Sequence, residues 1–148
     1  MKTINRHPAR CRRFQPGLLL ILLLASFLVH AENSGYWQQV ASRINASISE
    51  AEAQYAAGDA RAARAAVVNA YFSQFEDSKM EAAMRMELGS KHTWQVEKSF
   101  GRLRKAIKKG APKKEVTAIA EEIRTAIGSD AKKLDAAGIS AQVFEVNQ

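Results

Sequence analysis

The sequence predicts an all-α protein: an antiparallel up-and-down four-helix bundle with a short C-terminal helix and tail. Apolar residues recur three and four positions apart through most of residues 34–127, which is the spacing of one helix face. Glycines separate these stretches, and no stretch alternates polar and apolar residues as a half-buried strand does. Because the connections at the glycines are short, neighbouring helices are expected to run antiparallel.

The first thirteen residues carry five basic side chains and no acid. The apolar run from Leu18 to Val29 follows, and Ala31 completes a small-residue site of the kind that a signal peptidase cleaves. We therefore expect residues 1–31 to be a cleaved signal peptide and residues 32–148 to form one helical-bundle domain. The run is shorter than the roughly 20 residues of a spanning helix. The mature protein is thus expected to be periplasmic or secreted, with no membrane-spanning segment.

The expected cleavage changes the charge and the cysteine content of the protein. Five of the 22 Lys and Arg residues and none of the 15 acids leave with the leader, so a net charge of +7 falls to +2. A net charge this small does not indicate a nucleic-acid partner. The only cysteine, Cys11, also lies in the leader. The mature chain therefore excludes disulfides, thiolate metal sites and a haem attachment motif.

Glycines and capping residues set the limits of the expected helices. Gly58 ends the first helix and Asp59 caps the second, while Ser78 and Ser90 are expected to cap later segments. Gly128 is expected to end the fourth helix. The predicted helices cover residues 34–57, 60–76 with a continuation over 78–88, 91–108 and 112–127, followed by a short helix over 129–137 and a tail from Ile139 that lies against the bundle.

The stretch around Tyr71 holds the densest group of aromatic residues in the mature chain. If one α-helix continues through it, residues four apart share a buried face: Val68, Phe72, Glu76, Met80 and Met84. Glu76 is then a carboxylate in an apolar position, which requires an ion pair, hydrogen bonds or a metal ion. In the alternative, the helix ends near Glu76 and its side chain caps the turn or lies in water. Phe72 is expected to face Phe100 of the third helix across the core.

No catalytic constellation is visible in the sequence, and we expect the protein not to be an enzyme. His92, the only histidine of the mature chain, is interpreted as an exposed or capping residue rather than a ligand. Glu97 lies on the flank of the third helix's apolar stripe. Two alternatives stay open for it: an ion pair with a basic residue of another helix, or convergence with Glu76 on one cavity.

Two short patterns resemble a known family. The Ala-Tyr-Phe-x-x-Phe-Glu segment ending at Glu76 and the later Glu-x-x-Phe-Gly segment starting at Glu97 look like the extracytoplasmic helical domain of bacterial high-affinity iron permeases. That family is related to the oxidase-dependent iron transporters of fungi. The resemblance covers residues 55–107. The family transports iron through membrane helices with an Arg-Glu-x-x-Glu motif, which this chain lacks, so the chain resembles the soluble domain without the membrane part.

The resemblance implies a periplasmic accessory or metal-binding module in iron uptake. By matching position it points to Glu76, Glu81 and Glu97 as metal residues, with iron or another transition metal ion as the cofactor. The implied partners are an inner-membrane iron permease or a periplasmic metal-binding protein. The alternative is a metal-free structural or protein-interaction bundle in the periplasm. Metal content and partner identity separate these two functions.

Overall fold

The computed structural model of the protein describes residues 35–144, and the side chains of residues 35–142. The expected signal peptide, residues 1–31, and the last four residues of the tail lie outside the described residues. No helix within the described range combines the length and the apolar character that crossing a membrane requires.

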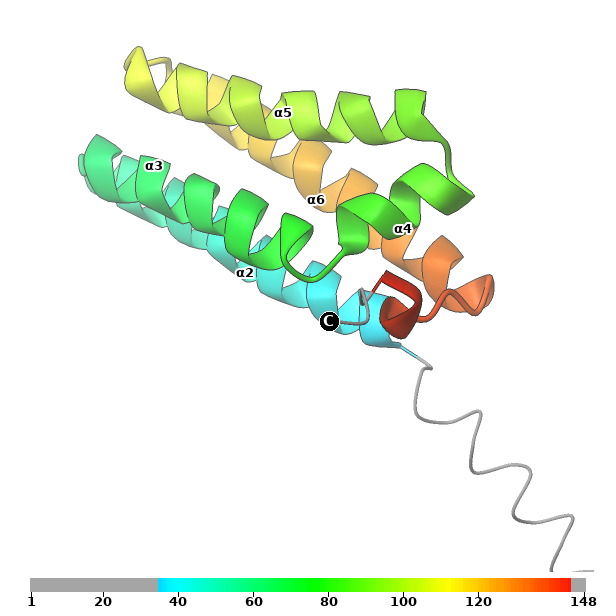
Figure 1. Cartoon of the computed structure of the whole chain (residues 1–148). Helices are drawn as coiled ribbons and strands as arrows, with labels where there is room; N and C mark the ends of the chain where they lie inside the picture. Colours follow the sequence, from blue (N-terminus) through cyan, green and yellow to red (C-terminus); the bar gives the residue numbers. More distant parts are fainter. Residues whose placement is uncertain (1–34, 145–148) are drawn as a thin grey trace, which may run out of the picture. The chain divides into compact units, whose positions relative to one another are not determined.

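The described chain is a bundle of helices without a strand (Figure 1). The α2 helix packs against α3 and α6, and α5 packs against α3 and α6 on the other side. The short helix α4 covers α5 and η1. The all-α prediction is therefore confirmed. The elements in chain order are α2 (Tyr36–Ala56), α3 (Ala60–Asn69), the π-helix η1 (Ala70–Glu76), α4 (Met80–Glu87), α5 (Ser90–Lys108), α6 (Lys113–Ala136) and the 3-10 helix η2 (Ala141–Phe144).

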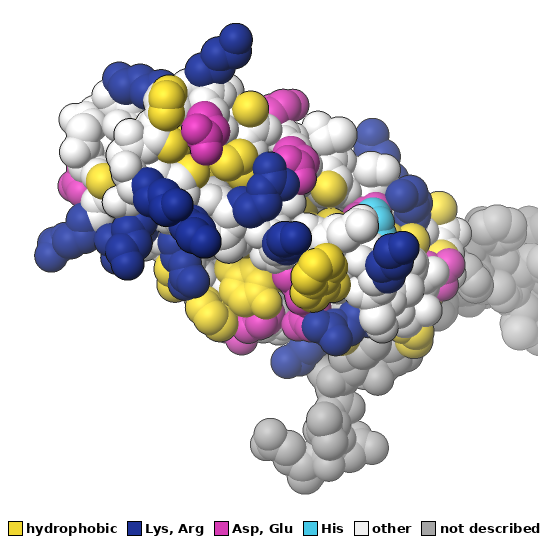
Figure 2. Space-filling view, turned by 90° about the horizontal axis from the view of Figure 1, so that it is seen from above, with side chains coloured by type: hydrophobic (Ala, Val, Ile, Leu, Met, Phe, Trp, Pro, Cys, Tyr) yellow, Lys and Arg dark blue, Asp and Glu magenta, His cyan; other side chains and the backbone are white. Residues whose placement is uncertain are grey.

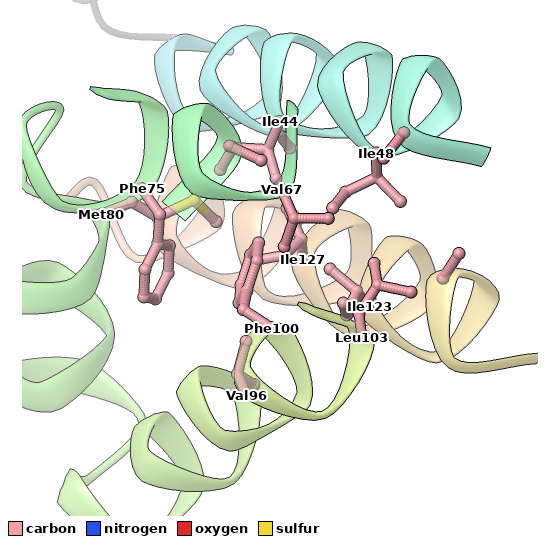
Figure 3. Packing of buried hydrophobic residues seen from close by; sticks show 14 of the residues in the cluster. Ile44, Ile48, Val67, Phe75, Met80, Val96, Phe100, Leu103, Ile123 and Ile127 are labelled. Atoms are coloured by element: carbon pink, nitrogen blue, oxygen red, sulfur yellow. The ribbon is translucent and has the colours of Figure 1, made fainter. Parts of the chain in front are cut away.

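The core lies between the four longest helices, α2, α3, α5 and α6. Branched aliphatic side chains interdigitate there around Phe100 (Figure 3). Ile44 of α2 and Ile127 of α6 are fully buried there. Removing each such side chain from water contributes about 1.5–3 kcal/mol. The end of the core is closed by Trp37, whose indole Nε1 donates a hydrogen bond to the carbonyl of Ile139 at 2.6 Å. The tail therefore lies against the bundle at Ile139, as the sequence predicted.

The glycine and the capping residue between α2 and α3 have the predicted roles. Gly58 takes a φ of 90° after α2, a left-handed conformation that a residue without a Cβ adopts at no steric cost. Asp59 Oδ1 accepts a hydrogen bond from the backbone N–H of Ala62 at 2.8 Å, which caps α3.

The predicted buried face through Phe72 is wrong. Phe72 is 49% exposed and Val68 is 37% exposed, whereas Met80 and Met84 of the same predicted stripe are buried. Val68 is exposed because the buried face of α3 is formed by Ala63, Ala66 and Val67 instead. The π-helix then changes the spacing within η1, because its hydrogen bonds join residues five apart, as from Asp77 N–H to Phe72 O at 3.0 Å. The buried residues therefore follow a spacing of five instead of four: Ala70, Phe75 and Met80.

The two serine caps are also wrong. The Ser78 hydroxyl donates back to the carbonyl of Phe75 at 3.4 Å, and Lys79, with a φ of 66°, stands between Ser78 and the start of α4. The left-handed turn at Lys79 separates Ser78 from the free backbone N–H groups that a cap must reach. Ser90 is the first residue of α5 and makes no capping hydrogen bond.

Gly128 does not end a helix, and the predicted short helix over 129–137 is the second half of α6. The backbone stays helical there because Ala131 and Leu134 continue the buried face of Ile127 beyond the glycine. A glycine inside a helix costs about 1 kcal/mol relative to alanine, and burial of these side chains outweighs that. The helix ends instead at Gly138, where φ is 67°.

Candidate functional site

The π-helix η1 brings three aromatic rings together with Phe100 of α5. The ring centre of Tyr71 lies 5.5 Å from that of Phe100, and Phe75 stacks on Phe100 at 5.6 Å. Phe72 meets the Tyr71 ring edge-on at 4.9 Å. Aromatic pairs of this geometry add about 0.5–1.5 kcal/mol beyond the area that they bury. The cluster thus holds the Tyr71 ring in place, while about half of Phe72 faces solvent.

The three glutamates singled out in the sequence lie near enough to Tyr71 for their charges to add to the rise that burial causes in its pKa. The Arg85 guanidinium, one turn after Glu81 on α4, donates to the Glu81 carboxylate at 2.7 Å and to the Glu97 carboxylate at 2.8 Å. Glu76, at the end of η1, lies beside the Tyr71 hydroxyl. We call these five residues the carboxylate cluster. Glu97 thus pairs with a basic residue of another helix, which was one of the two open alternatives.

Burial and like charges set the protonation of the cluster. Burial raises the pKa of Glu81, the neighbouring Glu97 raises it further, and Arg85 opposes both. Burial also raises the pKa of Tyr71, and the Glu76 carboxylate adds to that rise. A raised pKa is expected wherever carboxylates share a poorly solvated space. The cluster holds three carboxylates and one guanidinium, which pairs with Glu81 and Glu97, so it carries net negative charge when all three glutamates are ionised.

The carboxylate cluster does not form a ready metal site. Within residues 35–144 no group of three or more His, Cys, Asp or Glu side chains is placed to hold a metal ion. Arg85 bridges Glu81 and Glu97 and so takes the place that a shared cation would occupy. Carboxylate oxygens suit hard and borderline cations. A metal ion would therefore have to displace Arg85 before it could draw the carboxylates together.

A groove runs between the α3–η1 segment and α5, next to the carboxylate cluster. Its first section is a pocket of about 170 Å³. Val67, Tyr71 and Phe100 line it, and Glu97 closes one end. A second section continues from Phe72 along both helices. The two sections share four lining residues, which makes them one continuous feature, the α3–α5 groove: Val68, Phe72, Gly101 and Arg104.

The second section of the groove is basic. Two arginines of α3 and three basic residues of α5 line it, and no Asp or Glu does. Figure 2 shows Lys and Arg side chains gathered beside hydrophobic ones, at the end of this face where α5 ends and α3 begins. None of the five forms an ion pair with another described residue, in contrast to Arg85, Arg102 and Arg124. The five are Arg61, Arg64, Arg104, Lys105 and Lys108.

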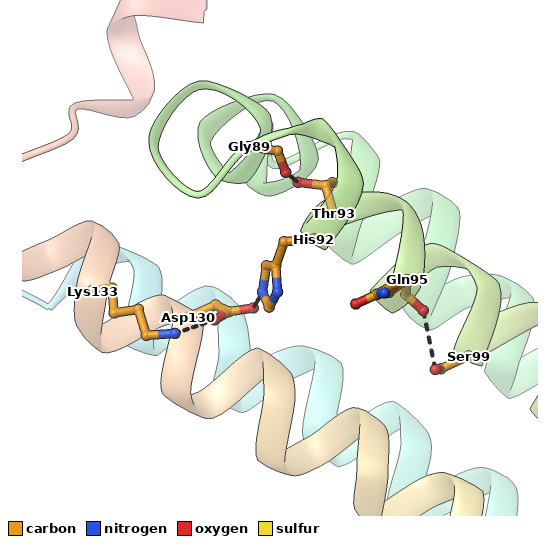
Figure 4. A network of polar contacts seen from close by, with 7 residues as sticks. All are labelled: Gly89, His92, Thr93, Gln95, Ser99, Asp130 and Lys133. Carbon is orange, nitrogen blue, oxygen red and sulfur yellow. Dashed lines mark hydrogen bonds and ion pairs between the residues drawn. The ribbon is translucent and has the colours of Figure 1, made fainter.

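His92 was interpreted from the sequence as an exposed or capping residue. The structure shows that it also has a partner in the bundle. Its Nε2 lies 2.6 Å from Oδ2 of Asp130, and Lys133 Nζ lies 3.0 Å from the other carboxylate oxygen (Figure 4). Asp130 is 1% exposed, whereas 39% of the His92 side chain is exposed. A buried carboxylate needs such partners. The network therefore ties α5 to α6 and leaves Asp130 fully engaged.

Sequence reasoning missed Arg85, Asp130 and the basic groove. Arg85 follows Glu81 by four residues, a spacing that pairs side chains on one helix face, and this signal was present. The spacing of the basic residues on α3 and α5 was also visible. The groove itself could not be predicted, because nothing in the sequence shows that α3 places Arg61 and Arg64 opposite the basic residues at the end of α5.

Comparisons with family models, curated proteins and solved structures find no match to this chain. The resemblance to the iron-permease domain therefore rests only on the two sequence patterns described above.

Proposed function

We propose that this domain is a non-catalytic interaction module of the periplasm, which holds a partner protein in the α3–α5 groove. One observation carries the proposal: the groove combines a half-exposed Phe72 with five basic side chains that have no acidic partner among the described residues. Neighbouring exposed apolar side chains with a polar rim are typical of interaction sites, and like charges gathered on one face repel one another. A bound partner supplies the missing contacts.

In the proposed arrangement the four longest helices run up and down in antiparallel order. The short connections of residues 57–59 and 109–112 support this order, because each joins helices that pack together. Spin labels on Ala57 and Lys109 are then expected to report a short distance, and labels on Ala57 and Lys91 a long one. The reverse ranking would contradict the antiparallel order.

In-cell photo-cross-linking tests the interaction module. A photoreactive amino acid replaces Ser73, which lines the groove and is exposed. The matched control places it at Lys132, an exposed position of α6. We expect one discrete protein product from position 73 and none from position 132. Adding Gly101→Leu, which fills the groove, should abolish that product. Identical products from both positions, or none from position 73, would contradict the proposal.

A second candidate function is metal binding in iron uptake at Glu76, Glu81 and Glu97. The observation that favours it is that Glu81 and Glu97 share a single arginine, and that burial, together with the charges of Glu97 and Glu76, raises the pKa of Glu81. In this candidate, iron or another transition metal ion displaces Arg85, and the domain acts with a permease or a periplasmic metal-binding protein. Because a bound ion stabilises only the folded protein, it should raise the melting temperature.

Calorimetric titration with ferrous, ferric, manganous and cuprous ions tests this second function. Binding should be lost in Glu76→Gln and strengthened in Arg85→Gln, because the latter removes the competing cation. Glu87→Gln, an exposed glutamate of α4 outside the carboxylate cluster, is the control. Heat and melting shifts that are absent in the wild-type protein and in Arg85→Gln would exclude the site.

A further inference from the structure

The shape of the α3–α5 groove suggests what kind of partner occupies it. Its residues on α3 and η1 recur at positions 61, 64, 68 and 72, and those on α5 at 101, 104, 105 and 108. These spacings of three and four keep each set on one helix face. Eleven residues separate Arg61 from Phe72, which corresponds to roughly 16 Å along a helix, or about three turns. The groove is thus long enough for a segment of three helical turns.

The floor of the groove can accept apolar side chains. Val68 is 37% exposed and Phe72 is 49% exposed, and both line the groove. Gly101 of α5 lines the same groove, and a Cβ added there would meet no atom within 4 Å. A helix that lies in a groove places residues spaced three and four apart on such a floor.

The charges of the groove select the partner. Basic side chains stand on both walls, Arg64 on α3 and Lys105 on α5 among them, with the apolar residues between. Like charges on one face and across from one another repel, so an acidic partner relieves this repulsion. The Glu97 carboxylate, which lines the first section, is already paired with Arg85, so it leaves no unpaired anion to offset the basic residues of the groove.

We propose that the α3–α5 groove binds an acidic amphipathic helix of a partner protein, with its apolar face against Val68 and Phe72 and its acidic residues toward Arg64 and Lys105. The inference rests on the proposed interaction module and names the chemistry of its partner. A helix fits better than a membrane surface, because the apolar residues line a concave groove between two basic walls. Insertion into a bilayer requires the apolar side chains to protrude.

The probe for this inference is a synthetic 14-residue peptide with capped ends. It carries leucines at helical spacing on one face and glutamates on both flanks. A control peptide has the same composition with the leucines scattered around the helix. Vesicles of phosphatidylglycerol and phosphatidylcholine form the third arm. Fluorescence anisotropy measures binding to the mature protein, and amide chemical shifts identify the residues that are affected.

We expect the amphipathic peptide to bind and to shift amides along α3 and α5. The double variant Arg64→Glu with Lys105→Glu should weaken binding by about tenfold or more, because it places like charges in the interface. Lys114→Glu with Lys132→Glu, two exposed sites of α6, changes the net charge equally and should alter binding by less than about twofold. Gly101→Leu should also abolish binding, with unchanged circular dichroism showing that the fold remains.

Equal binding of the scattered peptide would overturn the inference, since it would mean general charge attraction. Vesicle binding without peptide binding would also overturn it and would identify the groove as a membrane-facing surface. No binding in any arm would do the same. In these cases the cross-linking experiment at position 73 still decides whether the groove holds a protein of another chemistry. The partner inference and the proposed function therefore fail separately.

Discussion

Helix α6 and the segment from α3 through α4 cover the same core with different geometry. In α6 the buried residues keep helical spacing over the whole of Lys113–Ala136, and Gly128 does not interrupt them. In the α3–α4 segment the spacing lengthens to five through the π-helix η1. The regular helix presents its apolar face inward throughout. The π-helix turns part of its apolar and acidic side chains outward, and these side chains line the groove and the carboxylate cluster.

Each of the two segments also has a carboxylate beside its apolar stripe. The partners and the burial of these two carboxylates differ. Asp130 of α6 stays in the core, where His92 and Lys133 bind its two oxygens. Glu76 of η1 is turned to the edge of the core, beside the Tyr71 hydroxyl. The comparison teaches that a carboxylate beside the core can be held by direct ion-pair partners, as Asp130 is, or can lie at the edge of the core among other carboxylates, as Glu76 does.

The largest expected effect contrasts two neighbouring aromatics of η1. Phe75→Ala should lower the free energy of unfolding by about 3–5 kcal/mol, the range for a buried aromatic, because Phe75 is fully buried. Phe72→Ala should lower it by about 1 kcal/mol or less, as for a surface substitution. Urea denaturation measures both, with Phe100→Ala as the buried control on α5. A larger loss for Phe72 than for Phe75 would mean that Phe72 and not Phe75 faces the core.

Removing the buried carboxylate of α6 should have the next largest effect. Asp130→Ala should destabilise the protein by about 1–3 kcal/mol, because it removes the buried partner of two hydrogen bonds. The loss of stability stays moderate because His92 and Lys133 are partly exposed and can form hydrogen bonds with water instead. Thermal unfolding measures it. The same substitution at the exposed Asp77 next to η1 is the control and should be nearly neutral.

Gly128→Ala should stabilise the protein by about 0.5–1 kcal/mol, because alanine loses less conformational freedom in a helix than glycine does. A Cβ at this position meets no atom within 4 Å, and the backbone is helical. Differential scanning calorimetry measures the gain. Gly138→Ala is the matched control, since its φ of 67° penalises a side chain. Destabilisation by Gly128→Ala would mean that α6 breaks where the sequence predicted.

The smallest expected effect is a pH dependence that arises at the carboxylate cluster. The folded protein raises the pKa of Glu81 above its ordinary value of 4.5. The folded state therefore holds this proton more tightly than the unfolded chain. Its contribution to stability is complete below pH 4.5 and is lost as the pH rises through the raised pKa.

Glu81→Gln should remove this part of the pH dependence, since glutamine does not ionise. Urea midpoints between pH 4 and pH 8 measure it, and Glu87→Gln on the exposed side of α4 is the control. A wild-type protein that becomes more stable across this interval, with the rise removed by Glu81→Gln, would mean that Arg85 outweighs burial at this carboxylate.

Much of the fold could be predicted from local patterns. The limits of α2, the cap at Asp59 and the buried stripe of Val96, Phe100, Leu103 and Ile107 on α5 all match the structure. These features depend on neighbours three and four residues away, so the residues in the sequence determine them by themselves. The grouping of Glu76, Glu81 and Glu97 came from the resemblance, and the structure brings these three around Tyr71.

Tertiary structure alone decided the spacing of five in η1, the continuation of α6 through Gly128 and the existence of the groove. The π-helix forms where its spacing buries Phe75 and Met80 together, a gain that depends on what the other helices present to them. Gly128 stays helical because side chains beyond it find a core to enter. The groove needs Arg64 and Lys105 to face each other across two helices. No local pattern determines which faces meet, since that follows from how the helices bury apolar surface jointly.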